Sequence, residues 1–285
     1  MAIFIILITS HLMMLIIVKV GGSVIRKGVD NLVKEVPGLI NNGHRVILIH
    51  GGGYFINELM ERMGLKPKFV TSPSGVTSRY TDQETLRAYV MGMMYLNKDL
   101  VSRLQGVGVN AIGLSGVDGG LLRARRRESM VIIDERGRER VVDGGYTGKI
   151  ESANKDFIMK LLNDGFTPVI APIAMDNKTG GPLNVDGDQA LEILSLFLMP
   201  KYAVILTDVD GVLINGKVIN RVSAAEAQEL FKNPEVRGGM KRKVYTAAQL
   251  ASKGVYAIIS NGVIDKPIMS AINGVGTHVI PTGNS

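Results

Sequence analysis

The most constraining feature of this sequence is a regular alternation between short apolar runs and longer amphipathic segments. Short β-branched runs are typical of buried strands, and apolar residues three and four positions apart are typical of helices. The predicted strands are Leu15–Val20, Arg45–Ile49, Val109–Leu114, Thr167–Ala171, Ala203–Thr207, Tyr256–Ser260 and His278–Ile280. The predicted helices are Asp30–Asn41, Tyr54–Met63, Asp82–Leu104, Lys155–Asn163, Gln189–Phe197, Ala224–Phe231, Lys243–Ser252 and Pro267–Ile272. This order predicts an α/β fold, a three-layer α/β/α sandwich around a mostly parallel sheet.

Two segments interrupt this alternation and are predicted to be β-hairpins. The first is Met130–Val142, with its turn at Glu135–Gly137. The second is Ala174–Val185, with its turn at Asn177–Gly181. Because neither segment fits between a strand and a helix, we expect both hairpins to project from the edge or rim of the sheet.

The apolar N-terminus precedes the first predicted strand. No Lys or Arg occurs before Lys19, so the basic leading region of a signal peptide is missing. A membrane span needs about 20 apolar residues, whereas this run meets Lys19 and two glycines. We expect residues 1–14 to be an N-terminal extension of a cytoplasmic protein, with a membrane anchor as the alternative. A boundary near Pro172 predicts an N-terminal lobe at residues 15–172 and a C-terminal lobe at residues 173–285.

Charge and composition narrow the classes of partner. The 33 Lys and Arg residues exceed the 26 Asp and Glu residues, giving a net charge of +7. This charge suits nucleic acid, an anionic membrane surface or an acidic small partner. Aromatic residues make up only 5% and Trp is absent, which argues against a stacking platform for single-stranded nucleic acid. The absence of cysteine excludes disulfides and thiolate metal sites. We expect no nucleic acid, no membrane and no metal site made of protein ligands.

Two glycine-rich turns follow the first two predicted strands. The first strand ends in Lys19-Val20-Gly21-Gly22, which places an ammonium group beside a backbone that can approach an anion. The second ends in His50-Gly51-Gly52-Gly53 and leads at once into a helix, whose N–H groups can bind a phosphate. Neither turn has the sequence of a P-loop. A lysine at the rim of a strand and a plain tight turn are the alternatives.

Four further segments carry polar or charged side chains next to the ends of predicted strands or helices. Arg79 precedes a long helix and can clamp a carboxylate. Asn184–Asp188 opens a helix with more polar side chains than one N-cap needs. Thr207–Gly211 follows a buried strand, where α/β sheets bind ligands. Arg237–Lys243 combines glycines with cations before a helix. Each segment also has a structural reading as an exposed loop, a cap or a basic surface.

Together and in this order, these motifs resemble the amino-acid kinase family. The matching motifs are Lys-x-Gly-Gly, His-Gly-Gly-Gly, Asn-x-Asp-x-Asp, Thr-Asp-x-x-Gly-Val and Gly-Gly-Met-x-x-Lys, spread between residues 15 and 281. Within the family, the acetylglutamate kinase branch is most similar, but the Gly-x-Arg-Val-Thr-Asp stretch of that branch differs here. Gly75–Asp82 is two residues longer before Arg79 and has Tyr80 in place of Val. With Gly113–Gly119, this form is similar to kinases that act on aminoadipate or glutamate whose amino group is held by a small acidic carrier protein.

The resemblance implies an ATP-dependent transfer of a phosphoryl group to a side-chain carboxylate, with Mg²⁺ held between phosphate oxygens mostly by water. Lys19 and Lys243 would stabilise the moving group, and Asp188 would hold both lysines. The implied substrate-binding residues are Gly52, Gly53, Arg79 and Asn184. The implied nucleotide-binding residues are Gly21, Gly22, Thr207, Asp208, Asp210 and Gly239. Because the attacking carboxylate is ionised near pH 7, no general base is needed.

The segment between residues 121 and 140 carries seven arginines against four acids. A basic projecting hairpin can steer and seat an acidic carrier protein, with a solvated charged hairpin as the alternative. The resemblance also suggests a homodimer through the N-terminal half. It implies that the N-terminal lobe, residues 15–172, binds the acyl substrate and that the C-terminal lobe, residues 173–285, binds ATP. Two other functions stay open: an acetylglutamate kinase acting on free N-acetylglutamate, and a non-catalytic nucleotide sensor or carrier-binding protein.

Overall fold

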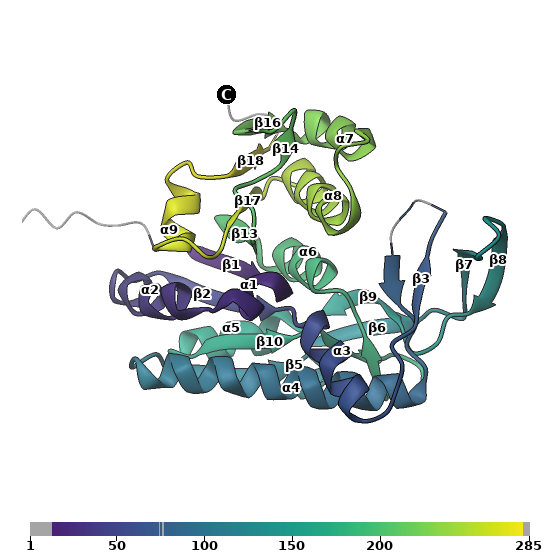
Figure 1. Ribbon diagram of the computed structural model, residues 1–285. Helices are drawn as coiled ribbons and strands as arrows, with labels where there is room; N and C mark the ends of the chain where they lie inside the picture. Colours follow the sequence, from purple (N-terminus) through teal and green to yellow (C-terminus); the bar gives the residue numbers. More distant parts are fainter. Residues whose placement is uncertain (1–12, 74, 76, 282–285) are drawn as a thin grey trace, which may run out of the picture.

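The computed structural model describes residues 13–73, 75 and 77–281, and its centre is an eight-stranded sheet (Figure 1). The strand order is β16-β18-β17-β13-β1-β2-β10-β5. Neighbouring strands are parallel except β17 and β18. The strands are β1 (Leu15–Val20), β2 (Arg45–His50), β5 (Ala111–Ser115), β10 (Thr167–Ala171), β13 (Tyr202–Thr207), β16 (Arg221–Ser223), β17 (Tyr256–Asn261) and β18 (Thr277–Ile280). The predicted mostly parallel sheet is confirmed.

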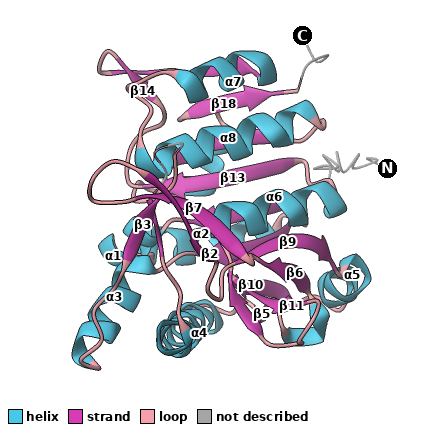
Figure 2. Ribbon diagram, turned by 90° about the vertical axis from the view of Figure 1, so that its right-hand side faces the viewer, coloured by secondary structure: helices cyan, strands magenta, loops and turns pink. Residues whose placement is uncertain are grey.

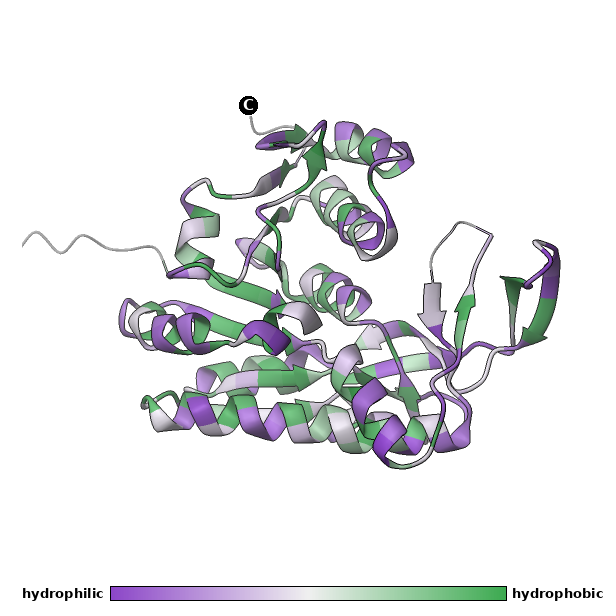
Figure 3. Cartoon of the chain, in the orientation of Figure 1, coloured by the Kyte–Doolittle hydropathy of each residue, from purple (hydrophilic) through white to green (hydrophobic). Residues whose placement is uncertain are grey.

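Helices cover both faces of this sheet, because successive side chains of each strand point to opposite faces. In β1, Ile16, Val18 and Val20 pack against the layer of α1 (Gly22–Lys27), α2 (Asp30–Asn41), α4 (Gln83–Gly106) and α9 (Pro267–Ile272). Ile17 packs against the other layer. That layer contains α5 (Lys155–Asn163), α6 (Gly187–Leu198), α7 (Ala224–Lys232) and α8 (Gly238–Ser252), with α6 and α8 side by side (Figure 2). Figure 3 shows hydrophobic strands between helices whose outer faces are hydrophilic.

Two smaller four-stranded sheets extend the fold on the side of β5 and α3 (Gly53–Arg62), whereas a two-stranded sheet lies at the opposite end, near α7 (Figure 1). One has the order β12-β11-β6-β9 and another the order β4-β3-β7-β8; β14 (Leu213–Ile214) pairs with β15 (Lys217–Val218). Their other strands are β3 (Phe69–Thr71), β4 (Thr77–Arg79), β6 (Leu122–Arg126), β7 (Ser129–Ile133), β8 (Glu139–Asp143), β9 (Gly148–Ala153), β11 (Ile173–Asp176) and β12 (Pro182–Asn184).

Both predicted hairpins form, in different surroundings. β7 and β8 make the first, and they project from the body together with β3 (Figure 1). β11 and β12 make the second. It packs against the body of the protein, because Ala174, Leu183 and Val185 belong to the main hydrophobic core. The alternating apolar residues of this hairpin face that core, and its strand β11 also pairs with β6.

The boundary near Pro172 falls between β10 and β11, yet the main sheet runs through both halves. β1 pairs with β13 from Ile16↔Tyr202 to Val20↔Leu206. Strands on one side of this pair come from before Pro172, and strands on the other side come from after it. The division into two lobes with separate ligands stays a prediction. Of the expected extension at residues 1–14, residues 1–12 lie outside the described ranges. No helix among the described residues is long and apolar enough to cross a membrane.

Candidate functional site

Two glycine turns meet at the carboxyl ends of β1 and β2. α1 begins at Gly22 after the first turn, and α3 begins at Gly53 after the second. A Cβ atom at Gly51 would lie 2.9 Å from the Gly22 nitrogen, and one at Gly22 would lie 3.1 Å from the Gly52 nitrogen. Only residues without a Cβ allow the two backbones to approach this closely. The N–H groups at the start of α3 therefore border a cradle that suits an anion.

A buried carboxylate lies between two lysines beside this cradle. Asp188, in the first turn of α6, is 3% exposed, and Lys19 of β1 is 7% exposed. The Lys19 Nζ lies 2.8 Å from Asp188 Oδ1. The Lys243 Nζ, from α8, lies 3.9 Å from Asp188 Oδ2. The three residues predicted to be catalytic, which are far apart in the sequence, thus form one cluster.

Burial disfavours each charge in this cluster, and the ion pairs decide which groups stay ionised. Burial acts to lower the pKa of Lys19, but attraction to Asp188 and Asp186 outweighs it and raises that pKa above its ordinary value. Burial acts to raise the pKa of Asp188, but Lys19 and Lys243 hold it below its usual range. Burial and repulsion from Lys19 lower the pKa of Lys243. The Lys19–Asp188 pair is therefore firmly ionised, and Lys243 is the lysine that loses its proton more easily.

A second ion pair supports the cluster and was not among the predicted site residues. Asp186 caps α6, since its Oδ1 accepts from the N–H of Asp188 at 2.9 Å and from that of Gln189 at 3.3 Å. Its other carboxylate oxygen pairs with the guanidinium of Arg242 on α8. This pair joins the start of α6 to α8, beside Lys243. The sequence signal was the acidic N-cap in Asn184–Asp188 and the cation next to Lys243.

The cluster and the glycine turns open into a cavity of about 340 Å³, here called the central pocket. Arg79 lies in it, donating from Nη2 to the Gly53 carbonyl at 2.8 Å, with its guanidinium carbon 5.3 Å from the centre of the Phe69 ring. Asn184 donates from Nδ2 to Thr81 Oγ1 at 2.8 Å. The pocket is lined by Lys19, Gly22, Gly51, Gly52, Gly53, Phe69, Thr77, Ser78, Arg79, Tyr89, Met93, Thr147, Pro172, Asn184, Val185, Asp186, Gly187 and Arg242. All four predicted substrate-binding residues therefore border one cavity.

Two buried side chains in or beside the pocket were not among the predicted site residues. The Tyr89 hydroxyl lies 3.0 Å from the Pro172 carbonyl oxygen and 3.3 Å from that of Val185. His50 is fully buried, and its Nε2 lies 3.3 Å from Asn97 Nδ2. Burial lowers the pKa of His50 to about 4, so its ring is neutral near pH 7. His50 lies at the end of β2 and Tyr89 lies in α4. Both are buried and neutral near pH 7, so they contribute to the shape of the pocket and not to its charge.

Three of the predicted nucleotide-binding residues, Thr207, Asp208 and Asp210, lie at the carboxyl end of β13. Lys27 lies 3.3 Å from Asp208 Oδ2, and Asn261 donates to Asp210 Oδ1 at 2.8 Å. The Thr207 carbonyl accepts from the Gly262 N–H at 2.7 Å, which fixes the turn after β13.

The predicted glycines contact neighbouring parts of this region. The N–H of Gly21 bonds to the Leu206 carbonyl at 2.9 Å, which joins the first glycine turn to β13. Gly239 accepts from Lys243 Nζ at 3.3 Å. Of the predicted nucleotide-binding set, only Gly22 also lines the central pocket.

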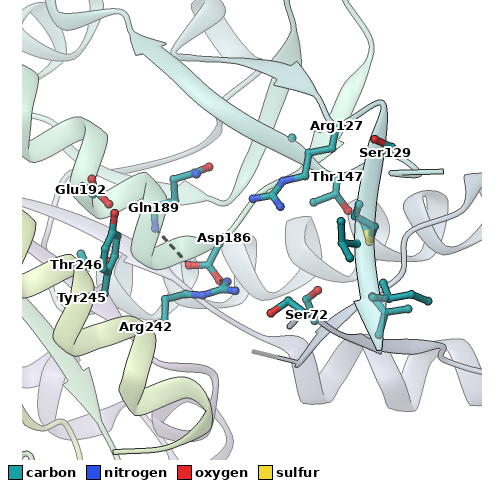
Figure 4. A pocket seen from close by; sticks show the side chains of 16 residues that line it. Ser72, Arg127, Ser129, Thr147, Asp186, Gln189, Glu192, Arg242, Tyr245 and Thr246 are labelled. Carbon is teal, nitrogen blue, oxygen red and sulfur yellow. Dashed lines mark hydrogen bonds and ion pairs between the residues drawn. The ribbon is translucent and has the colours of Figure 1, made fainter. Parts of the chain in front are cut away.

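A second cavity, of about 450 Å³ and here called the hairpin pocket, adjoins the central pocket. The two cavities share Ser78, Thr147, Asp186 and Arg242. Its other lining residues are Val70, Ser72, Arg127, Ser129, Met130, Val131, Ile132, Gly148, Gln189, Glu192, Tyr245 and Thr246 (Figure 4). A third cavity, the arginine pocket, is lined by Arg125, Arg126, Arg127, Glu128, Ser129 and Lys149. The hairpin pocket shares Arg127 and Ser129 with the arginine pocket, so the three cavities adjoin one another between the lysine cluster and a basic surface.

Within the described ranges, no group of three or more His, Asp or Glu side chains is placed to hold a metal ion. The two carboxylates of the cluster, Asp186 and Asp188, are both paired with cations. The donor set therefore fits a phosphate group better than a metal ion bound by protein ligands.

Comparisons with known proteins agree with this arrangement. The sequence model of the amino acid kinase family matches residues 14–261 of this chain. A Pyrobaculum calidifontis protein is 50% identical over 265 residues, which cover 93% of this chain and 98% of that protein. A Saccharolobus solfataricus protein named LysW-aminoadipate/LysW-glutamate kinase is 44% identical over 266 residues, covering 93% and 99%. The structure of Giardia carbamate kinase, 17% identical, superposes with a TM-score of 0.68 over 95% of this chain and 99% of that one, and shares the fold.

Proposed function

Because the chain belongs to the amino acid kinase family, we propose that it transfers the γ-phosphoryl group of ATP to the side-chain carboxylate of aminoadipate or glutamate attached to an amino-group carrier protein. The product is an acyl phosphate, an intermediate of lysine or arginine biosynthesis. The observation that carries this proposal is the placement of Asp188 between Lys19 and Lys243, beside two glycine turns. The names of the similar proteins supply the class of acceptor.

In this proposal a carboxylate oxygen of the acceptor forms a bond to the γ-phosphorus while the bond from that phosphorus to the β–γ bridging oxygen breaks. ADP leaves, and no proton is transferred, because the acceptor is already ionised near neutral pH. Lys19 and Lys243 neutralise the charge on the phosphoryl oxygens, and Asp188 holds both ammonium groups in place. The N–H groups of Gly52 and Gly53 bind the transferred group. Such a reaction depends on positioning and charge more than on covalent help.

Acceptor and nucleotide approach from opposite sides of this cluster. Arg79 and Asn184 bind the acceptor's α-carboxylate end in the central pocket, where burial lowers the pKa of Arg79 without discharging it. Gly21, Gly22, Thr207, Asp208, Asp210 and Gly239 border the nucleotide. In this proposal the N-terminal lobe, residues 15–172, serves mainly the acceptor, and the C-terminal lobe, residues 173–285, serves mainly ATP, while Asn184, Gly21 and Gly22 contribute across the boundary. Mg²⁺ would neutralise the phosphates, held by their oxygens and water, since Asp186 and Asp188 are engaged by cations.

The arginines of the hairpin around residues 121–140 supply a surface for the acidic carrier, although Arg125 and Arg126 at its base are paired with Glu151 and Asp143. At its tip, Arg138 and Arg140 both lie 3.1 Å from Asp134, which neutralises part of their charge. At the base, Arg127 lines both the hairpin pocket and the arginine pocket and makes no ion pair with a described residue. Opposite charge here speeds association and orients the partner.

A homodimer through the N-terminal half is also proposed. Exposed apolar side chains on α3 and α4 support it: Met91 is 50% and Tyr95 is 62% exposed, and Tyr95 stacks on Phe55 at 5.2 Å. Sedimentation should give twice the chain mass, and Tyr95→Glu should give the single-chain mass. A monomeric wild-type protein would contradict this proposal.

The test of the reaction is ADP release from MgATP with four acceptors: free glutamate, N-acetylglutamate, and glutamate or aminoadipate attached to an acidic carrier protein. We expect turnover with the carrier-linked acceptors only. Turnover with N-acetylglutamate would instead assign the protein to acetylglutamate phosphorylation. ATP binding without turnover of any acceptor would favour a nucleotide sensor.

A further inference from the structure

Two side chains of α6 line the hairpin pocket without a role in the lysine cluster. Gln189 and Glu192 are three positions apart, so they lie one above the other on the helix. In Figure 4 both lie on the same side of the pocket as Tyr245, with Thr147 and Ser129 on the other side. Because the hairpin and central pockets share four lining residues, a ligand can extend from Lys19 to this wall.

The orientation of the Gln189 amide is fixed by the backbone. Its Oε1 accepts from the N–H of Ile150 at 2.9 Å. A backbone N–H only donates, so the oxygen must face β9 and the NH₂ group must face away from it. Among the residues that the structure describes, this NH₂ group donates to none. Gln189 therefore offers a donor of fixed direction.

Glu192 offers an acceptor that the fold does not use. Burial raises the pKa of Glu192, while the charge of Lys149 lowers it. Within the described part of the chain, its carboxylate makes no hydrogen bond and no ion pair. A half-buried carboxylate without a partner costs folding free energy. Its position is therefore better explained by a ligand than by stability.

We propose that Gln189 and Glu192 form a subsite for an amide of a peptide-like group joined to the amino nitrogen of the acceptor. Gln189 donates to the carbonyl of this amide, and Glu192 accepts from an N–H group. The apolar wall of Met130, Val131 and Ile132 covers the same cavity. The proposal rests on the proposed function, and it makes these residues determinants of specificity, because a single N-acetyl group lacks the further amides of a peptide.

Calorimetric binding without ATP tests the subsite with two probes. One is N-acetylaminoadipate, and the other is aminoadipate joined through its amino nitrogen to a short acidic peptide. We expect the wild-type protein to bind the peptide-linked probe at least about ten-fold more tightly. Glu192→Leu should weaken only that probe, by about ten-fold, and should leave the melting temperature equal or higher. Gln189→Glu, which keeps the acceptor for Ile150, should act in the same direction.

The sign of the effect separates the subsite from general electrostatics. Removing a negative charge should strengthen the binding of an acidic peptide if only net charge matters, whereas the subsite requires weaker binding. Glu229→Gln, on exposed α7, is the matched control and should change neither probe.

Three outcomes overturn the subsite: no binding of the peptide-linked probe, equal binding of both probes, or unchanged or tighter binding to Glu192→Leu. ADP release is measured separately on the same wild-type protein. Tight binding of the peptide-linked probe without turnover would overturn the proposed reaction and keep the subsite.

Discussion

Replacing Asp188 by Asn tests the central cluster most directly, because among the described residues Asp188 is the one acid that lies within 4 Å of both lysines. At an effective dielectric constant of about 20, a charge pair at the 2.8 Å separation of Lys19 and Asp188 attracts by about 6 kcal/mol. The longer 3.9 Å contact of Lys243 attracts by about 4 kcal/mol on the same scale. Desolvation offsets much of this attraction, and removal of one partner from a buried pair costs about 3–5 kcal/mol. We expect Asp188→Asn to lower the free energy of unfolding by that amount.

The pH dependence supplies an independent check. The pKa of Lys19 is raised above its ordinary value, mainly by Asp188 acting against burial. In the wild-type protein the pair's contribution is therefore complete below the unfolded pKa of about 10.4 and is lost as pH rises through the higher folded value. Without Asp188, burial lowers the pKa of Lys19. The difference in free energy of unfolding between the wild type and Asp188→Asn should then shrink between pH 7 and pH 10, because the buried lysine of the folded variant loses its proton in this range.

Urea unfolding at pH 7 and pH 9.5 measures both effects, and ADP release measures catalysis, which should fall at least ~100-fold. Glu229→Gln is the matched control, since Glu229 and Lys232 form an exposed pair at 2.8 Å outside the proposed site, and such a pair contributes about 1 kcal/mol or less. An Asp188→Asn variant within about 1 kcal/mol of the wild type, and with a similar kcat, would refute the reasoning from the buried pair.

The remaining predictions concern single side chains. Arg79→Lys loses the planar fork and should raise the KM for the acceptor by about ten-fold or more with little change in the KM for ATP; equal changes in both would exclude a role at the acceptor. Glu35→Ala leaves the N–H groups of Ile268 and Met269, now bonded at 2.8 and 2.6 Å, without a partner, and should lower the free energy of unfolding by about 2–3 kcal/mol in urea titrations. The pKa of His50 is about 4 in the folded protein, so the unfolded state binds a proton first as the pH falls. The free energy of unfolding should therefore fall by about 3 kcal/mol between pH 6.5 and pH 4. His50→Gln should flatten that part of the stability profile, and an unchanged slope would assign the loss to other groups.

The main sheet could be predicted because its strands are buried on both faces and therefore read as continuous apolar runs. β6 was missed since its sequence, Leu-Arg-Ala-Arg-Arg, alternates buried residues with arginines that point outward. α8 was predicted to begin at Lys243 and begins at Gly238. Glycine has a low helix propensity, so the first turn of this helix gives no signal in the sequence.

The residues of the site could be predicted where each belongs to a short local motif. The distances and contacts between these residues could not be predicted. Lys19, Asp188 and Lys243 were selected by their motifs, and the structure brings them together. Their roles stay predictions until variants are measured. The ion pair between Asp186 and Arg242 joins residues 56 positions apart, and no local pattern encodes such a contact. Pocket-lining residues such as Tyr89 and Glu192 were missed for the same reason.

The position of Lys19 in β1 also bears on how the strand finds its partners. Its neighbours in the sheet are Ile49 and Ile205, which belong to the core beneath α6, so Lys19 occupies a place where the pattern of the strand would otherwise put an aliphatic side chain. If β1 paired one residue out of step, every side chain would change faces. The ammonium group would then be buried among aliphatic residues, away from Asp188, at a prohibitive cost. The residue proposed for phosphoryl transfer therefore also acts against misaligned strand pairing during folding, and its replacement by an aliphatic residue would remove this safeguard together with activity.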